Sequence, residues 1–361
     1  MDLPAQVIDP HIHQWDPLTN PSLVSKEARL LRWLPRIPRQ VRRLLPPADR
    51  EFAGDPQPLL KPYRPAGYVA DTGDVHVRAV VHIEAAWHGE EHIDKVDETR
   101  WVRDLPWGRD GAPQLGAMVV GVDPRRADAG AVLDAHAEAS PLTRGVRFMA
   151  SHHDDAGVRD FADAPGILTD KRTLDGFAAV AERGLSTELW CYGHQLAETL
   201  PLVEAYPEAT FVLDHHGTPA GALGQVGKET GRTEKDRRDI LARWRDDIAA
   251  LADRPNVVAK QSGLGMGALG GPGVKGGLLS APREVGSAAY EAFLDAAAPL
   301  VRHSYDCFGA ERSMWASNFP VDKPRLTLPA TARLLLDALG EDADPQALFH
   351  DVAARTYRIE I

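Results

Sequence analysis

The sequence predicts an α/β protein with the (β/α)8 architecture of a TIM barrel. Along its 361 residues, short apolar, β-branched runs alternate with longer amphipathic stretches, which is typical of parallel α/β folds. Eight such runs are present, and eight is a number of strands that closes a barrel. Because one barrel takes about 250 residues and often carries insertions, we expect residues 1–361 to form a single domain.

The expected strands are separated by amphipathic helices along the whole chain. In the second half a proline ends a helix and a strand follows at once, as in the stretch YPEATFVLDHH. The last helix is expected to complete the outer ring of the barrel. The strands are expected at Gln6–Asp9, Val75–Ile83, Leu115–Val120, Gly145–Met149, Ser186–Cys191, Thr210–Leu213, Asn256–Lys260 and Ser313–Ala316, and helices at Asp128–Ala139, Thr173–Arg183, Gln195–Tyr206, Lys235–Ala252 and Pro345–Tyr357.

Two segments depart from this alternation. Residues 16–73 separate the first strand from the second and are rich in proline and arginine. Residues 263–280, which follow the seventh strand, contain eight glycines between Gly263 and Gly277. Loops that follow the strands of a barrel build its active site, so we expect both segments to lie over the barrel mouth. Surface insertions with no catalytic role are the alternative.

Composition restricts the class of protein. The net charge of −11 argues against nucleic acid as a partner, because phosphate binding needs a basic surface. Two cysteines give neither a disulfide framework nor a cysteine-based zinc site. No apolar run approaches the ~18 residues that span a bilayer, and no secretory signal is apparent. We expect a cytoplasmic enzyme with a small-molecule substrate and no membrane or nucleic-acid partner; the oligomeric state stays open.

The strongest chemical signal is the stretch VIDPHIHQWDP at the first strand. Alternate residues of a strand point to the same face, so His11 and His13 are expected to point together into the barrel near its carboxyl-terminal rim. Two imidazoles within about 7 Å suit one divalent metal, or they can polarise a carbonyl oxygen without a metal. Two unrelated core histidines are the alternative.

These motifs resemble the amidohydrolase superfamily, and within it the amidohydrolase-related lactonases that act on sugar acids and on pyrone dicarboxylates. IDPHIHQWDP is similar to the opening of those enzymes, and GVRFM, FVLDHHGTP, NVVAKQSGL and MWASNFPVD resemble their fourth, sixth, seventh and eighth strands. FHDVAARTYRI is similar to their closing helix. The matches run in order over nearly the whole chain, apart from residues 16–73.

The resemblance implies that His215, from FVLDHHGTP, joins His11 and His13 as a catalytic residue that binds the scissile carbonyl. The same three residues would hold a metal where one is present. Three neutral imidazoles suit zinc. We expect no obligatory cofactor, and one zinc ion on His11, His13 and His215 stays open. His216 has the opposite strand parity and is expected to pack or to reach solvent.

Further candidates lie at other strand ends. Arg147 in GVRFM suits an acidic substrate, since arginine holds carboxylates bidentately, although an ion pair with a neighbouring carboxylate is the alternative. Lys260 in VAKQSG has the same two interpretations. Glu84 can orient or activate a water at the second strand, or it can pair with a cation. Trp190 and Tyr192 flank the fifth strand and are expected to give the substrate an apolar wall with a phenolic handle.

Strand eight departs from the family pattern. Related enzymes usually carry an aspartate there, in a pattern like GSDWP, which takes a proton from the attacking water. Here Asn318 stands in that place and is expected to bind water or substrate, because a carboxamide cannot accept the proton near neutral pH. Asp322, Glu84 or a histidine can supply the base instead. The other two accounts are a different reaction, such as retro-aldol cleavage or decarboxylation, and a protein that only binds.

The leading hypothesis is therefore a hydrolase that acts on the ester-like bond of a small, acidic lactone. A metal-dependent decarboxylase or hydro-lyase of the same superfamily is the first alternative. A non-catalytic small-molecule binder is the second. A serine hydrolase is disfavoured, because the sequence has no Gly-Xaa-Ser-Xaa-Gly elbow.

Overall fold

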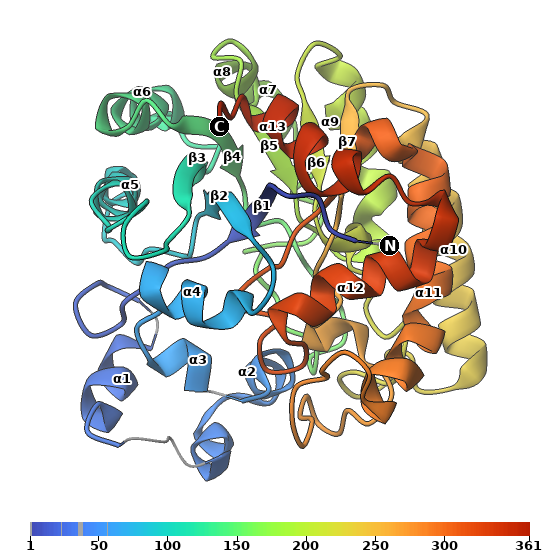
Figure 1. The fold of residues 1–361 in the computed structure, drawn as a ribbon. Helices are drawn as coiled ribbons and strands as arrows, with labels where there is room; N and C mark the ends of the chain where they lie inside the picture. The colour runs from blue at the N-terminus through green and yellow to red at the C-terminus, as the bar shows by residue number, and fades with distance from the viewer. Residues whose placement is uncertain (1, 23, 35–38, 56) are drawn as a thin grey trace.

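The computed structural model describes residues 2–22, 24–34, 39–55 and 57–361. Eight parallel strands follow one another around one sheet in chain order (Figure 1). A parallel bridge between Ile12 and Phe319 brings the last strand back to the first. The predicted (β/α)8 barrel is therefore confirmed. Its strands are β1 (Val7–Ile12), β2 (Val77–Ile83), β3 (Gln114–Gly121), β4 (Thr143–Arg147), β5 (Ser186–Leu189), β6 (Phe211–Leu213), β7 (Val257–Gln261) and β8 (Ser313–Trp315).

Each expected strand overlaps one of these, and β1 differs most. The expected strand ends at Asp9, directly before Pro10, which has no N–H to donate to a ladder. In the structure β1 continues to Ile12, and its pairing with β2 shifts register between Asp9 and Ile12. Such an irregularity accommodates the proline. His11 therefore lies within the strand, and His13 directly follows it.

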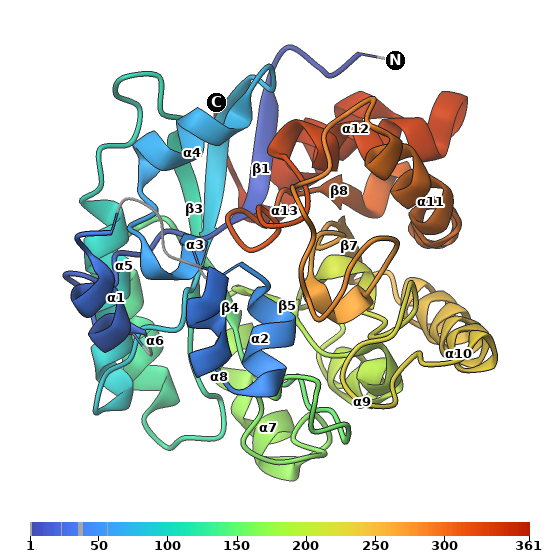
Figure 2. The same cartoon turned by 90° about the horizontal axis from the view of Figure 1, so that it is seen from below.

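Helices surround the barrel as expected, with two differences. The helix expected at Pro345–Tyr357 is a π-helical turn, Ala347–Asp351, followed by α13 (Val352–Tyr357), and it packs against the barrel interior instead of completing the outer ring. The helix expected at Thr173–Arg183 is two short helices, α7 and α8, which meet at Phe177. Figures 1 and 2 show α10, α11 and α12 on one side of the barrel and α5 and α6 on the other. The helices are α1 (Ser25–Leu31), α2 (Pro47–Ala53), α3 (Gln57–Leu60), α4 (Pro65–Thr72), α5 (Val96–Arg103), α6 (Ala129–Ala139), α7 (Lys171–Gly176), α8 (Ala178–Ala181), α9 (Leu196–Ala205), α10 (Glu234–Ala252), α11 (Ala288–Phe308), α12 (Leu328–Leu339) and α13 (Val352–Tyr357).

The barrel interior is apolar at one end. Inward side chains such as Ile8, Val119 and Met314 form a buried cluster with Val352 and Tyr357 of α13. The carboxyl-terminal helix thus closes the amino-terminal end of the barrel, as the bottom of a TIM barrel is usually closed for stability. Ionisable side chains fill the other end, where the strands finish.

The long segment between β1 and β2 contains α1 to α4, and Figures 1 and 2 show α1, α2 and α3 together at the end of the barrel opposite α13. The buried side chain of Arg325 joins this segment to the glycine-rich loop after β7. Its guanidinium donates to the carbonyls of Glu51 and Phe52 in the segment, and to those of Gly265 and Gly277 in the loop, at 2.6–3.2 Å. The guanidinium of Arg325 therefore hydrogen-bonds both the segment between β1 and β2 and the glycine-rich loop.

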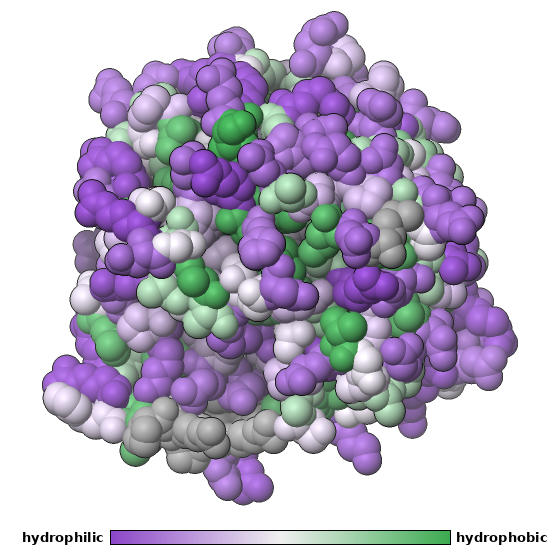
Figure 3. Space-filling model, in the orientation of Figure 1, coloured by the Kyte–Doolittle hydropathy of each residue, from purple (hydrophilic) through white to green (hydrophobic). Residues whose placement is uncertain are grey.

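The surface is mostly hydrophilic on the face that Figure 3 shows, with apolar residues in small separate groups. Among the helices of the described residues, none combines the length and the hydropathy that crossing a membrane requires.

We predict that Arg325→Met destabilises the fold and loosens the segment between β1 and β2. The variant leaves several buried carbonyl groups without a donor, which costs at least about 2 kcal/mol in the free energy of unfolding. Urea unfolding measures the loss, and limited proteolysis shows where the chain opens. Arg238→Met is the matched control, because Arg238 forms only an exposed pair with Glu234 on α10. Equal stability of the two variants would contradict this role of Arg325.

Candidate active site

Two histidines of the first strand meet at the carboxyl-terminal end of the barrel. The ring centroids of His11 and His13 are 5.0 Å apart, and both side chains are buried. The Nδ1 of His13 lies 2.9 Å from the carbonyl oxygen of Ile83. Because a carbonyl only accepts, Nδ1 carries the proton and Nε2 keeps the lone pair. His13 can therefore accept a proton or bind a metal through Nε2.

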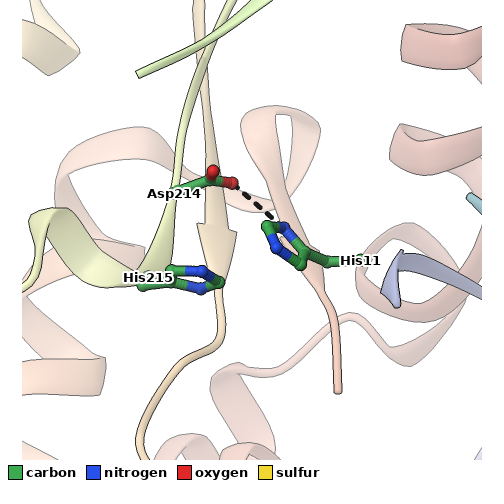
Figure 4. Close-up of side chains that lie close together, drawn as sticks. All are labelled: His11, Asp214 and His215. Carbon is green, nitrogen blue, oxygen red and sulfur yellow. Dashed lines mark ion pairs between the residues drawn. The ribbon is translucent and has the colours of Figure 1, made fainter. Parts of the chain in front are cut away.

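A tight turn after β6 adds Asp214 and His215. His215 has φ +55° and begins a 3-10 turn, His215–Gly217. The turn breaks the alternation of strand faces, so consecutive side chains reach the same site (Figure 4). Asp214 Oδ1 lies 3.2 Å from His11 Nδ1, and the ring centroids of His11 and His215 are 4.4 Å apart. His216, which also has positive φ, is fully buried.

His11, Asp214 and His215 form a candidate metal centre. One ligand atom from each lies within 4.8 Å of the others, and this is the one such group among the described residues. Two imidazoles and a carboxylate are a donor set that zinc accepts. The expected set contained His13 in place of Asp214. Asp214 shares the strand parity of Val212, whose side chain lies in the barrel interior, so alternation directs Asp214 inward, and the turn then brings His215 beside it.

All three histidines are held neutral. Burial, and then the charge of Lys260, lowers the pKa of His11 well below the ordinary value of 6.5. Burial, and then His11, does the same to the pKa of His215. Burial and then the Arg147 guanidinium lower the pKa of His13 to about 3. Neutral imidazoles retain a lone pair, which both metal binding and general-base catalysis need.

Lys260 of β7 lies inside the barrel beneath this group. Its ammonium is fully buried and donates to Glu188 Oε2 at 2.6 Å. It also lies 3.3 Å from Asp214 Oδ1 and 3.2 Å from His11 Nδ1. The Tyr357 hydroxyl of α13 donates to the other oxygen of Glu188 at 2.6 Å. Lys260, for which a substrate contact and an ion pair were the two expected roles, forms the ion pair and does not line the cavity.

Glu84 and Arg147 pair with each other, as one alternative for each residue anticipated. Arg147 Nε donates to Glu84 Oε1 at 2.8 Å, and Nη2 donates to the Glu84 carbonyl at 2.8 Å. Nη1 lies 3.5 Å from His11 Nε2. Burial alone would raise the pKa of Glu84, but Arg147 and then Lys95 outweigh it and lower the pKa to about 2. Arg147 donates to one Glu84 oxygen and the Ala86 N–H donates to the other, and this engagement of both oxygens opposes a role as general base.

Asn318 and Asp322 form a second pair, at the end of β8. Asn318 Nδ2 donates to Asp322 Oδ1 at 2.8 Å, and the backbone N–H of Gly265 donates to Asp322 Oδ2 at 2.8 Å. Burial raises the pKa of Asp322 to about 7, although both hydrogen bonds oppose the change. Asn318 faces the cavity, whereas Asp322 lies behind it. The side-chain amide oxygen of Asn318, Oδ1, is then left for a water or a substrate.

His13, Arg147 and Asn318 line a cavity of about 180 Å³. Its walls are mostly apolar and come from the barrel, the segment between β1 and β2, and the glycine-rich loop. Trp190 lines it beneath the Arg147 guanidinium, which lies 5.3 Å from the indole centroid. Tyr192 does not line it and donates instead to the Arg159 carbonyl at 2.7 Å. The polar lining residues are His13, Ser22, Glu84, Arg147, Arg159, His215 and Asn318, and the large apolar ones are Trp15, Phe52, Leu59, Met149, Phe161, Trp190 and Met266.

Three residues of the site have no place in the sequence prediction. Asp214 precedes His215 directly, and a carboxylate at a strand end would have been signal enough. Glu188 lies within β5, and its alternation predicts only an inward position. Arg159 belongs to the irregular loop after β4 and lines the cavity while its Nε lies 3.1 Å from Asp49 of α2. No local pattern indicates that contact.

Comparison with known proteins decides the family. The chain matches the family described as Amidohydrolase over residues 8–359. It belongs to that family. The barrel with histidines at its strand ends thus belongs to an enzyme of the amidohydrolase superfamily, and the predicted superfamily is confirmed.

Individual relatives are distant. The uncharacterised protein y4mH of Sinorhizobium fredii is 28% identical over 355 residues, 98% of each chain. An L-fucono-1,5-lactonase of Burkholderia multivorans is 30% identical over 220 residues, 60% of this chain and 64% of the lactonase. A B. multivorans amidohydrolase crystallised with bound zinc has a TM-score of 0.68 at 21% identity, covering 99% of this chain and all of that one. The last likeness shows the shared fold.

We predict an acid-sensitive contribution of Glu84 to stability. Its folded pKa of about 2 lies below the ordinary 4.5, so the contribution is complete above pH 4.5 and is lost as the pH falls toward 2. Glu84→Gln lacks this contribution. The difference in unfolding free energy between wild type and variant should shrink across that window in urea titrations. The exposed Glu234→Gln is the control, and a difference that grows with falling pH for Glu84→Gln would contradict the assignment.

Proposed function

We propose that this amidohydrolase hydrolyses the ester bond of a small lactone. The observation that carries the proposal is the position of His13, a neutral imidazole whose Nε2 lone pair remains free at the wall of a small, apolar cavity. The similarity to an L-fucono-1,5-lactonase supports an ester within a ring as the target.

In this proposal His13 and Asn318 hold the attacking water. The two residues are neighbours, because the backbone N–H of His13 donates to the Phe319 carbonyl at 2.8 Å. The side-chain amide oxygen of Asn318 accepts one hydrogen from the water, while His13 Nε2 accepts the proton that is lost on attack. Asp322 acts through Asn318, since it holds the amide nitrogen and so directs the amide oxygen. Glu84 is kept from the base role by Arg147.

Arg147 is the proposed partner of the carbonyl oxygen. Glu84 occupies Nε and Nη2, which leaves Nη1 toward His11 and the cavity. A fixed guanidinium in a buried site stabilises the negative charge that develops on the oxygen. Water thus adds to the carbonyl carbon, the ring C–O bond breaks, and the leaving oxygen takes a proton back from His13. The product is a hydroxy acid, which releases one proton to the solvent near neutral pH.

A metal has a defined place in this site. His11, Asp214 and His215 would hold it, and when bound it supplies a Lewis acid next to the cavity. His215 is also a cavity residue in its own right, with Nδ1 2.9 Å from Ser262 Oγ. The proposed roles of His13, Asn318 and Arg147 are the same with or without the metal.

The cavity also limits the substrate. A volume of about 180 Å³ suits a ligand of about one ring, since an apolar cavity of about 150 Å³ accommodates benzene. Trp15, Phe161 and Trp190 favour an apolar ring face. Arg159 places a guanidinium on the lining, which favours a substrate that carries a carboxylate. We therefore propose a compact, acidic lactone rather than one with many hydroxyl groups.

The proposal predicts proton release without gas. One-ring lactones, with and without a carboxylate, are offered to the purified enzyme in a pH-stat, and carbon dioxide is measured in parallel. We expect one proton per substrate consumed, and His13→Ala should lower kcat/KM by about 100- to 10,000-fold, as the loss of a general base does. His76→Ala, at an exposed histidine, is the control. Carbon dioxide in step with substrate loss would instead favour decarboxylation.

A second prediction separates the base from its support. If Asp322 acts through Asn318, then Asp322→Asn and Asn318→Ala each lower kcat by about 10- to 100-fold, and the double variant loses little more, because the two share one function. Steady-state kinetics of the three variants measure this. Additive losses in the double variant would assign Asp322 a separate role as the base.

A further inference from the structure

The ammonium of Lys260 shares two of its three neighbours with the candidate metal centre. Asp214 Oδ1 lies 3.3 Å and His11 Nδ1 lies 3.2 Å from Nζ, and both residues belong to the His11, Asp214 and His215 group. The third neighbour, Glu188 at 2.6 Å, binds the ammonium from the side of the barrel interior. A positive charge is thus already built into the wall of the centre.

Two features make this charge effective. Lys260, Glu188 and Asp214 have no exposed side-chain surface, so water does not screen the charge. Lys260 is also held from several sides, since its ammonium lies 5.3 Å from the Tyr357 ring centroid and Tyr357 donates to Glu188. The ammonium therefore cannot withdraw to solvent when another cation approaches Asp214.

We propose that Lys260 is a positioning residue. Its ammonium holds Asp214 and His11 in place and lowers the affinity of the candidate metal centre for zinc. The ammonium lies at ion-pair distance from Asp214, although neither Asp214 oxygen has a hydrogen-bond partner among the described residues. It repels a dication that binds to the same carboxylate and imidazole. The donor set of His11, Asp214 and His215 suits zinc, and Lys260 opposes its occupancy. The inference concerns metal binding and does not depend on which substrate the enzyme uses.

The test is the zinc affinity of the metal-free protein, measured by competition with a chromogenic chelator. Lys260→Met removes the charge and keeps an apolar side chain of similar length. We expect it to bind zinc at least about tenfold more tightly than wild type. A change of this size needs only a small part of the repulsion between a buried ammonium and a nearby zinc ion to be removed. Lys235→Met is the matched control, because Lys235 forms only an exposed pair with Asp239, and its zinc affinity should equal that of wild type.

A second set of variants guards against misfolding, since Lys260→Met leaves two buried carboxylates without their cation. Glu188→Gln keeps Lys260 and should bind zinc no more tightly than wild type. Adding Lys260→Met to Glu188→Gln removes one charge of each sign and should tighten binding at least about tenfold relative to Glu188→Gln. His215→Ala should abolish the gain, which places the zinc at this centre. Equal or weaker affinity without Lys260, in either background, overturns the proposal, as does a gain that survives His215→Ala.

Discussion

The buried network of Glu188, Lys260, Asp214 and His11 is the interaction on which the site depends. Burying single charges is costly, and a buried ion pair persists only when each member is paired and hydrogen-bonded. Here Lys260 has two carboxylates and an imidazole around it, and Tyr357 satisfies the outer oxygen of Glu188. The network joins the apolar half of the barrel interior to the polar half that holds the candidate active site.

Around this network, ion pairs and hydrogen bonds separate the roles of similar side chains. Glu84 forms an ion pair with Arg147, and Asp322 accepts a hydrogen bond from Asn318. Neither carboxylate is therefore available in the cavity as a free base. His13 instead presents a neutral ring whose tautomer the Ile83 carbonyl fixes. The site thus concentrates basic lone pairs and one guanidinium nitrogen in a small apolar space. Such a fixed environment favours attack on a carbonyl, because donors and acceptors need no reorganisation.

The fold was predictable from the sequence because hydrophobic periodicity reports strands and helices directly. All eight strands, their order and the helices α6, α9 and α10 follow from that pattern. Alternation also placed His11 and His13 together. It failed after β6, where the turn with positive φ at His215 brings that side chain into the site beside Asp214. Alternation does not show how deeply Lys260 lies inside the barrel. It also does not show whether Glu84 and Arg147 pair with each other or contact water and substrate. Those outcomes depend on side chains from strands far apart in the sequence.

The location of a bound product tests the central claim most directly. The enzyme is crystallised with the hydroxy acid that the best one-ring lactone yields. We expect the new carboxylate of the product to lie in the cavity, within hydrogen-bond distance of Arg147 Nη1, with its ring or chain against Trp190. The oxygen derived from water should face His13 Nε2 and the Asn318 amide. A product bound elsewhere on the molecule, or one in the cavity with its carboxylate turned away from Arg147 and His13, would contradict the proposed chemistry.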